Sequence, residues 1–194
     1  LGLDGEVYTG QELNYLMQEG AWVFHDIPYR YGNIDHIVLS RGGIFAVETK
    51  AVRKPADKAG NRKSKLVYQG GKLKFPHVPT TQPVEQAKRH ASCLAEFLAR
   101  QMGKTIPVTP VVAIPGWFVE SDGADGVLVI NPKRGTALRR AVCRELISTA
   151  DVKMVASRIE MLARTVQSNS DRIDPDASKK YSFWLRRKLE EEHF

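Results

Sequence analysis

Two acidic residues, Asp35 and Glu48, lie inside runs of the sequence that are otherwise rich in Ile, Val and Phe. An unpaired charge is costly to bury, so these positions imply a nearby cation. Two opposed carboxylates repel each other, and either Lys50 or a bound metal would relieve that repulsion. Oxygen ligands from adjacent strands suit a hard divalent ion such as Mg²⁺. The pattern favours a metal site, with a plain carboxylate–lysine ion pair at the end of a hairpin as the alternative.

A hairpin would bring the two acids together. Residues 34–40 (IDHIVLS) and 43–49 (GIFAVET) each predict a strand, and the glycines between them predict a tight turn. A loop at residues 41–42 places the two acids across from each other, whereas a loop at 42–43 places the first acid across from the lysine. Since side chains alternate along a strand, both registers gather the acids and the lysine on one face, and a three-residue loop does not.

The composition indicates a globular protein with a polyanionic partner. The chain has 194 residues, 42% of them hydrophobic and 26% charged, and a net charge of +7. The isoelectric point is near 9.5, which favours nucleic acid or an anionic surface as the partner. Lys and Arg residues are concentrated directly after the predicted strand 43–49. Those expected to contact a phosphate backbone are Lys54, Lys58, Arg62, Lys63 and Lys65.

The two cysteines, Cys93 and Cys143, have no zinc-binding spacing and do not form a disulfide framework. They fit a reducing environment, and no apolar run reaches the length of a membrane span. We therefore expect a cytoplasmic protein. A segment preceding Leu1 would change this expectation if it carried a membrane anchor or a signal.

The elements that must position these residues follow from periodicity and turn signals. They predict an α/β fold with a central mixed β-sheet flanked by helices. Residues 1–168 would form the main domain, and 169–194 a linker with a short charged C-terminal helix. The expected helices are 5–19, 81–102, 134–148 and 151–168; the expected strands are 22–27, 34–40, 43–49, a second hairpin at 65–75, 107–117 and 125–131; residues 51–64 are a basic loop.

Several short motifs in combination resemble the nuclease-related domain (NERD) family of the PD-(D/E)xK nuclease superfamily. The resemblance runs from about residue 5 to residue 115, and it implies a restriction-endonuclease-like core. The motifs are Gly5-Glu6, VFHDI (23–27), IDHIV (34–38), GIFAVETK (43–50) and QPVEQAK (82–88).

The resemblance also implies roles for individual residues. Asp35 and Glu48 would bind the metal together with the backbone carbonyl of Thr49, and Lys50 would act on the attacking water. Glu12 competes with Glu6 as the acid of the first helix, and Glu6 is preferred because it follows Gly5. The implied catalytic residues are Glu6, Asp35, Glu48, Lys50 and Gln86.

The expected activity is that of an Mg²⁺- or Mn²⁺-dependent DNA endonuclease, with no small-molecule cofactor. RNA as substrate, nicking or double-strand cleavage, one or two metal ions and the oligomeric state stay open. The main alternative is a catalytically silent nucleic-acid-binding module on the same fold. A glycoside hydrolase using Asp35 and Glu48 is a weaker alternative, because it would need no lysine beside its acids.

Overall fold

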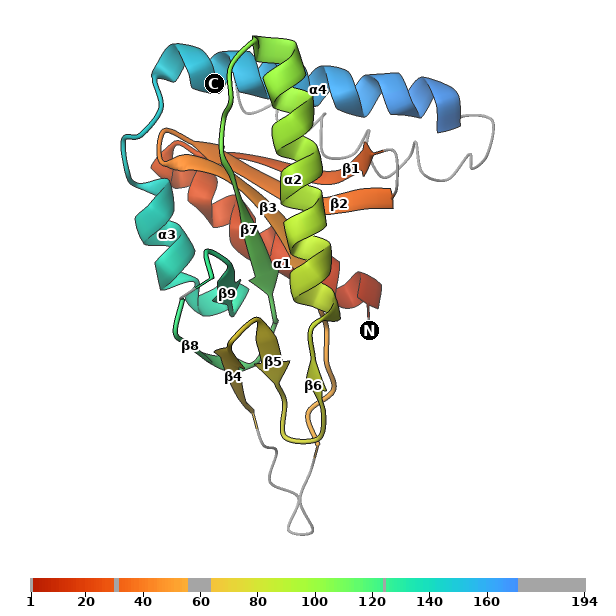
Figure 1. The fold of residues 1–194 in the computed structure, drawn as a ribbon, viewed down its shortest axis with the longest axis vertical. Helices are drawn as coiled ribbons and strands as arrows, with labels where there is room; N and C mark the ends of the chain where they lie inside the picture. The colour runs from red at the N-terminus through yellow and green to blue at the C-terminus, as the bar shows by residue number, and fades with distance from the viewer. Residues whose placement is uncertain (1, 30–31, 56–63, 124, 171–194) are drawn as a thin grey trace.

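The main sheet has five strands in the order β1-β2-β3-β7-β9 (Figure 1). The computed structural model describes residues 2–29, 32–55, 64–123 and 125–170. β1, β2 and β3 are antiparallel neighbours, whereas β7 and β9 run parallel to β3, so the sheet is mixed as predicted. The strands are β1 (Trp22–Tyr29), β2 (Gly32–Ser40), β3 (Gly43–Thr49), β7 (Val108–Ala113) and β9 (Leu128–Ile130).

Helices cover both faces of this sheet. One face packs against α2 and α4, and the other against α1, η1 and α3. The predicted α/β fold with a central mixed sheet flanked by helices is confirmed. The helices are α1 (Gly2–Asn14), the 3₁₀ helix η1 (Tyr15–Glu19), α2 (Gln82–Met102), the 3₁₀ helix η2 (Pro132–Arg134), α3 (Thr136–Val142) and α4 (Thr149–Ser170).

The long helix α2 follows directly from its sequence. Its apolar residues recur at helical spacing, and those at 87, 91, 94 and 98 are all buried. Pro83 lies near the start of the helix, where its missing N–H costs nothing. Gly103 ends the helix at a φ of 67°, and its N–H donates to the carbonyl of Ala99. The helix therefore begins and ends where its sequence predicts.

A second, smaller sheet has the order β6-β5-β4-β8 and lies below the main sheet in Figure 1. Its β4–β5 hairpin is the one predicted around residues 70 and 71, since Gln69 pairs with Lys72. Gly70 and Gly71 adopt φ values of 57° and 73°, which a side chain would disfavour. The strands are β4 (Lys65–Gln69), β5 (Lys72–Lys74), β6 (Pro79–Thr80) and β8 (Phe118–Ser121).

Some predicted boundaries were wrong. β1 continues through Pro28 to Tyr29, because it is an edge strand, where a proline leaves no ladder bond unmade. The predicted strand 107–117 ends at Ala113, and the chain then turns into β8. The predicted helix 134–148 is only α3, because the N–H groups of residues 146 and 147 bond to the β2–β3 turn instead.

The C-terminal part of the chain is described only as far as α4. This helix corresponds to the one predicted for 151–168, and it extends to Ser170. The predicted C-terminal helix lies outside the described residues, so the division at residue 168 stays a prediction. Within the described ranges, no helix is both long and apolar enough to cross a membrane.

Candidate active site

The β2–β3 hairpin has a two-residue loop at residues 41–42. Ser40 pairs with Gly43, and the same register carried outward sets Asp35 across from Glu48. Of the two predicted registers, the one that opposes the acids is therefore observed. The loop of three residues is excluded.

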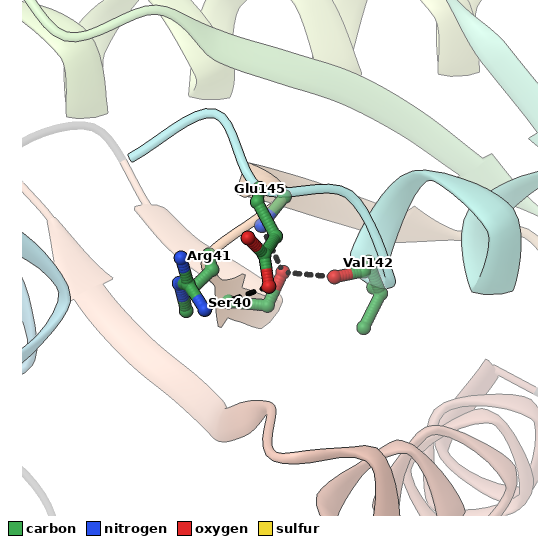
Figure 2. Close-up of polar contacts among 5 residues, drawn as sticks. Ser40, Arg41, Val142 and Glu145 are labelled. Atoms are coloured by element: carbon green, nitrogen blue, oxygen red, sulfur yellow. Dashed lines mark hydrogen bonds and ion pairs between the residues drawn. The ribbon is translucent and has the colours of Figure 1, made fainter. Parts of the chain in front are cut away.

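Contacts from the end of α3 hold this turn in place (Figure 2). Ser40 Oγ accepts the N–H of Gly42 at 3.0 Å and donates to the carbonyl of Val142 at 2.9 Å. A Cβ atom on Gly42 would collide with the carbonyl oxygen of Ala141, so only glycine fits here. The register that opposes the two acids is fixed by a segment about 100 residues away in the sequence.

Arg41 adds a second connection between the turn and the segment after α3. Its carbonyl accepts the N–H groups of Leu146 and Ile147 at 2.8 and 2.9 Å. Its guanidinium pairs with Glu145, with 2.8 Å between Nη1 and Oε1, as Figure 2 shows. The exposed ion pair contributes little to stability. The two backbone bonds to Arg41 use the N–H groups of residues 146 and 147, which are therefore not available to continue α3.

Asp35 is a partly buried carboxylate at the edge of the site. The backbone N–H of Thr49 donates to its Oδ2 at 2.7 Å. The pKa of Asp35 is raised to about 7, chiefly by burial, then by the charge of Glu48, with a smaller effect from Glu6. The Thr49 N–H and His90 act in the opposite direction. The carboxyl therefore competes for a proton near neutral pH, as expected for a buried carboxylate with other negative charges nearby.

Glu48 is buried, with only 6% of its surface exposed, and it faces α2. Its Oε2 lies 3.4 Å from Nδ1 of His90. Both atoms are buried, and neither has a hydrogen-bond partner in the part of the chain that the structure describes. His90 was not among the residues predicted from the sequence. Its spacing of one helical turn from Gln86, on the same face of a well-predicted helix, was the signal that could have found it.

Gln86 lies on α2 one turn before His90, with a half-buried side chain. The i, i+4 spacing sets the two residues on the same face of the helix, the face that His90 turns to Glu48. The predicted glutamine is thus near the carboxylate pair. In the described ranges its side chain makes no hydrogen bond, which leaves it free to bind a ligand.

Lys50 follows β3, and its side chain is exposed. Its backbone N–H donates to the carbonyl of Ala113 at 2.9 Å, which continues the β3–β7 ladder and keeps Lys50 on the side of Glu48. Among the described residues Lys50 forms no ion pair. The alternative of a plain carboxylate–lysine ion pair is therefore not what the hairpin forms.

Glu6 reaches the site from α1. Its negative charge raises the pKa of Asp35, so the two carboxylates are near each other. Gly5 makes this approach possible, since a Cβ there would lie 2.7 Å from the Cβ of Ala51. Glu12 instead hydrogen-bonds Tyr8, whose pKa is raised by burial and by this bond, and Glu12 borders a groove beside η2. The geometry therefore favours Glu6 as the helix acid.

His36 is buried on the opposite side of β2 from Asp35, under α1. Its Nδ1 lies 2.8 Å from Nδ1 of His25, whose Nε2 lies 3.0 Å from Oδ1 of Asn14. Burial lowers the pKa of His36 to about 3 and that of His25 to about 4, so both rings are neutral. This pair helps to hold α1, and therefore Glu6, against the sheet.

Of the predicted phosphate contacts, the structure describes Lys54 and Lys65. Lys54 reaches the turn after β7, where its Nζ would lie 3.7 Å from a Cβ on Gly116. Lys65 is on β4 and forms an exposed ion pair with Glu120, with 2.9 Å between Nζ and Oε1. Glu120, which lies outside the basic segment, would therefore compete with a phosphate for Lys65. Lys58, Arg62 and Lys63 lie outside the described residues.

The carboxylate pair fits one kind of metal better than another. In the described ranges, no three His, Cys, Asp or Glu side chains are arranged to hold an ion by themselves. A closed zinc site is therefore not what these residues form. Mg²⁺ needs only one or two carboxylates and keeps its waters. The opposed acids, the raised pKa of Asp35 and the unpartnered Oε2 of Glu48 are consistent with such an ion.

Comparison with known families agrees with this geometry. The model of the nuclease-related domain matches residues 1–115, which is more than half of the chain. The match includes α1, the β2–β3 hairpin and α2, and so contains every candidate catalytic residue. No curated protein and no solved structure matches the chain.

Proposed function

Because the chain belongs to the nuclease-related domain family, within the PD-(D/E)xK nuclease superfamily, we propose that it is a metal-dependent endonuclease that hydrolyses phosphodiester bonds in DNA. The observation that carries this proposal is the pair of opposed carboxylates. Asp35 has a pKa raised to about 7 by burial and by Glu48, on a hairpin whose register is fixed from outside. Such repulsion is typical of a site that is complete only with a cation.

Asp35, Glu48 and the carbonyl of Thr49 would hold Mg²⁺ or Mn²⁺. When bound, the ion supplies positive charge that stabilises the phosphate as negative charge develops on it. The Thr49 N–H keeps Oδ2 of Asp35 in place, so the other carboxylate oxygen can turn to the ion. His90, whose Nδ1 lies 3.4 Å from Oε2 of Glu48, would limit the orientation of that carboxylate from the side of α2. We regard His90 as a positioning residue, since it acts through Glu48.

Lys50 would orient the attacking water and interact with the phosphoryl oxygens. Its exposed ammonium group is free of ion pairs in the described part of the chain, and its backbone bond to Ala113 fixes where the side chain starts. Glu6 would complete the shell of the ion or position a second one. Gln86 would orient the substrate from α2.

The proposed substrate is bound largely through its backbone. The net charge of +7 favours a polyanion, and a basic segment directly after the catalytic hairpin would grip phosphates without reading sequence. This segment contains Lys54 and Lys65 together with Lys58, Arg62 and Lys63. A cytoplasmic location, which the cysteine pattern predicts, would give the protein access to DNA.

Incubation with supercoiled plasmid and with single-stranded RNA, in Mg²⁺, in Mn²⁺ and in EDTA, tests the proposal. We expect plasmid cleavage in both metals and none in EDTA. The Glu48→Gln variant is the matched control, because it keeps the shape of the side chain and removes its charge. Cleavage that persists in EDTA or in this variant would contradict the proposed site.

A catalytically silent binding module is the second candidate. It is favoured by the limited ligand set, which in the described residues does not reach three acidic, histidine or cysteine side chains around one point. Such a module would bind DNA with strong salt dependence and show no turnover in either metal. The same plasmid experiment separates the two candidates.

A further inference from the structure

A groove on the far side of the sheet is not used by the proposed catalytic site. It lies between the end of α1 with η1 and the segment formed by η2 and α3, and its volume is about 330 Å³. Its floor is apolar, because it is made of buried residues from the core between this face of the sheet and its helices. These are Leu13, Leu16, Ile130 and Leu138.

The rim of this groove is basic. Lys133 and Arg134 line it, and Arg140 and Arg144 follow on α3 and just beyond it. All four are exposed, and within the described ranges none of them forms an ion pair. Four exposed positive charges within 12 residues of sequence attract a polyanion. The fifth basic residue, Arg139, is the one that is neutralised, by an ion pair with Glu19.

Two acids lie at the groove. Glu19 pairs with Arg139 and accepts the thiol of Cys143 at 3.3 Å, so the charges of Glu19 and Arg139 cancel. Glu12 accepts a hydrogen bond from Tyr8 and keeps its negative charge, which offsets one of the two free cations of the lining, Lys133 and Arg134. The lining therefore keeps one positive charge in excess, and Arg140 and Arg144 add two more beside it.

An aromatic ring stands at the same rim. Tyr15 lines the groove and is 61% exposed, so its ring is accessible to a ligand. A basic groove with an exposed aromatic side chain is the arrangement by which proteins bind single-stranded nucleic acid, since the charges follow the backbone and a base stacks on the ring. Duplex DNA keeps its bases stacked inside and would not use the ring.

We propose that this groove binds a single-stranded segment of nucleic acid, with phosphates on Lys133 and Arg134 and a base stacked on Tyr15. The inference rests on the proposed function in one respect: the bound strand would be a flank of the substrate. Glu6 at the proposed catalytic site and Glu12 at the groove are six residues apart on α1, an axial distance of about 9 Å. At the stacked rise of about 3.4 Å per nucleotide, about three nucleotides span that distance.

The test is a fluorescence-anisotropy titration of labelled oligodeoxythymidylate of about 12 nucleotides, in EDTA and over a range of salt concentrations. The variants are Tyr15→Ser and the pair Lys133→Gln with Arg134→Gln. The matched control is Lys153→Gln with Arg164→Gln on α4, which removes the same charge from an exposed surface outside the groove. Melting curves confirm that each variant is folded.

We expect the groove pair to flatten the dependence of log K on log salt by about 0.7 for each phosphate that the variant no longer neutralises, while the control pair leaves the slope unchanged. Tyr15→Ser should weaken oligodeoxythymidylate binding roughly five-fold or more and leave duplex binding as it is. Equal effects of the two charge pairs would overturn the proposal, as would indifference of single-strand binding to Tyr15→Ser, or no binding at all.

This experiment fails separately from the proposed function, because it needs no turnover. If the protein binds oligodeoxythymidylate through the groove but does not cleave plasmid in either metal, the groove proposal stands and the nuclease proposal fails. If it cleaves plasmid while the groove variants bind like the wild type, the nuclease proposal stands and the groove proposal fails.

Discussion

The Nδ1 atom of His90 lies 3.4 Å from Oε2 of Glu48, and the two buried atoms face each other without a hydrogen bond in the described structure. At this distance and alignment the two atoms do not form a direct hydrogen bond. They are nevertheless close enough for His90 to limit the orientation of the Glu48 carboxylate. A buried carboxylate in such a position keeps one oxygen free for a ligand.

His90→Phe should disturb the aim of Glu48, whereas His90→Gln keeps a hydrogen-bond donor at the site. We expect the Phe variant to bind Mn²⁺ about ten-fold more weakly, since partners of metal-binding side chains contribute effects of this size. The Gln variant should stay within a few-fold of wild type. Thermal-shift titration with Mn²⁺ measures this, with kcat and KM for plasmid cleavage beside it. A Phe variant that titrates like the wild type would leave His90 with a purely structural role.

Asp35 gives the apo protein an unusual dependence of stability on pH. Its pKa is raised by folding from 3.8 to about 7, so the folded state binds a proton more tightly than the unfolded chain. The stability from this proton is fully present below pH about 4 and is lost as pH rises through about 7, by roughly 4 kcal/mol at most. Asp35→Asn should remove this loss.

Urea unfolding between pH 4 and 8, in EDTA, measures the difference between wild type and Asp35→Asn. The comparison isolates Asp35 because all other titrating groups are shared. If both proteins change in parallel over this range, the carboxyl is not held in the folded state as the structure indicates.

Glu48→Gln should relieve the repulsion across the hairpin. We expect the variant to keep or slightly raise its apo melting temperature, since a charge that raises the pKa of Asp35 is gone. It should lose both cleavage and the stabilisation by Mn²⁺, which comes from preferential binding of the ion to the folded state. Melting curves with and without Mn²⁺ check this. A wild type that is itself indifferent to Mn²⁺ would argue against a metal site.

Lys50→Ala should separate catalysis from stability. Lys50 is exposed and forms no ion pair in the described ranges, so the free energy of unfolding should change by less than about 0.5 kcal/mol. Cleavage should nevertheless fall steeply while Mn²⁺ still raises the melting temperature. Paired measurements of unfolding and of cleavage rate test this. Strong destabilisation by the alanine would instead mean that the lysine offsets the two carboxylates in the apo protein.

The β2–β3 turn can be tested by adding one methyl group. Gly42→Ala places a Cβ against the carbonyl oxygen of Ala141 and should cost on the order of 1–3 kcal/mol, with a comparable fall in metal affinity if the register shifts. Gly2→Ala is the matched control, because a Cβ there meets no atom within 4 Å. Urea unfolding compares the two. Equal stability of both variants would show that α3 does not hold the turn.

The sequence predicted those features that local rules decide. The period of two in the strands and the glycines at residues 42 and 43 predicted a tight hairpin, and both two-residue loops that they allow keep Asp35 and Glu48 on one face, whereas a three-residue loop does not. The choice between the registers depends on Ser40 bonding to Val142, a contact that no local pattern reports. The lower boundary of the first helix was also off, since α1 begins at Gly2 rather than at residue 5.

His90 was missed for a related reason. Helical periodicity sets it on one face with Gln86, but which way that face turns is decided by the packing of α2 on the sheet. The end of α3 was missed because residues 146 and 147 give their N–H groups to Arg41. In each case a contact between distant segments overrode the local preference.

The hydrogen bond from Ser40 to the carbonyl of Val142 bears on which part of the chain can fold by itself. The family match stops at residue 115, yet the parallel neighbour β9 and the peptide groups that seat the hairpin turn come from residues 128–147. A fragment cut at the boundary of the match would keep all five candidate catalytic side chains and lose the partner that sets their register. The smallest fragment able to preserve the geometry around Asp35 therefore extends at least to Ile147. Substitutions in residues 128–147 that remove these contacts would alter the hairpin as well.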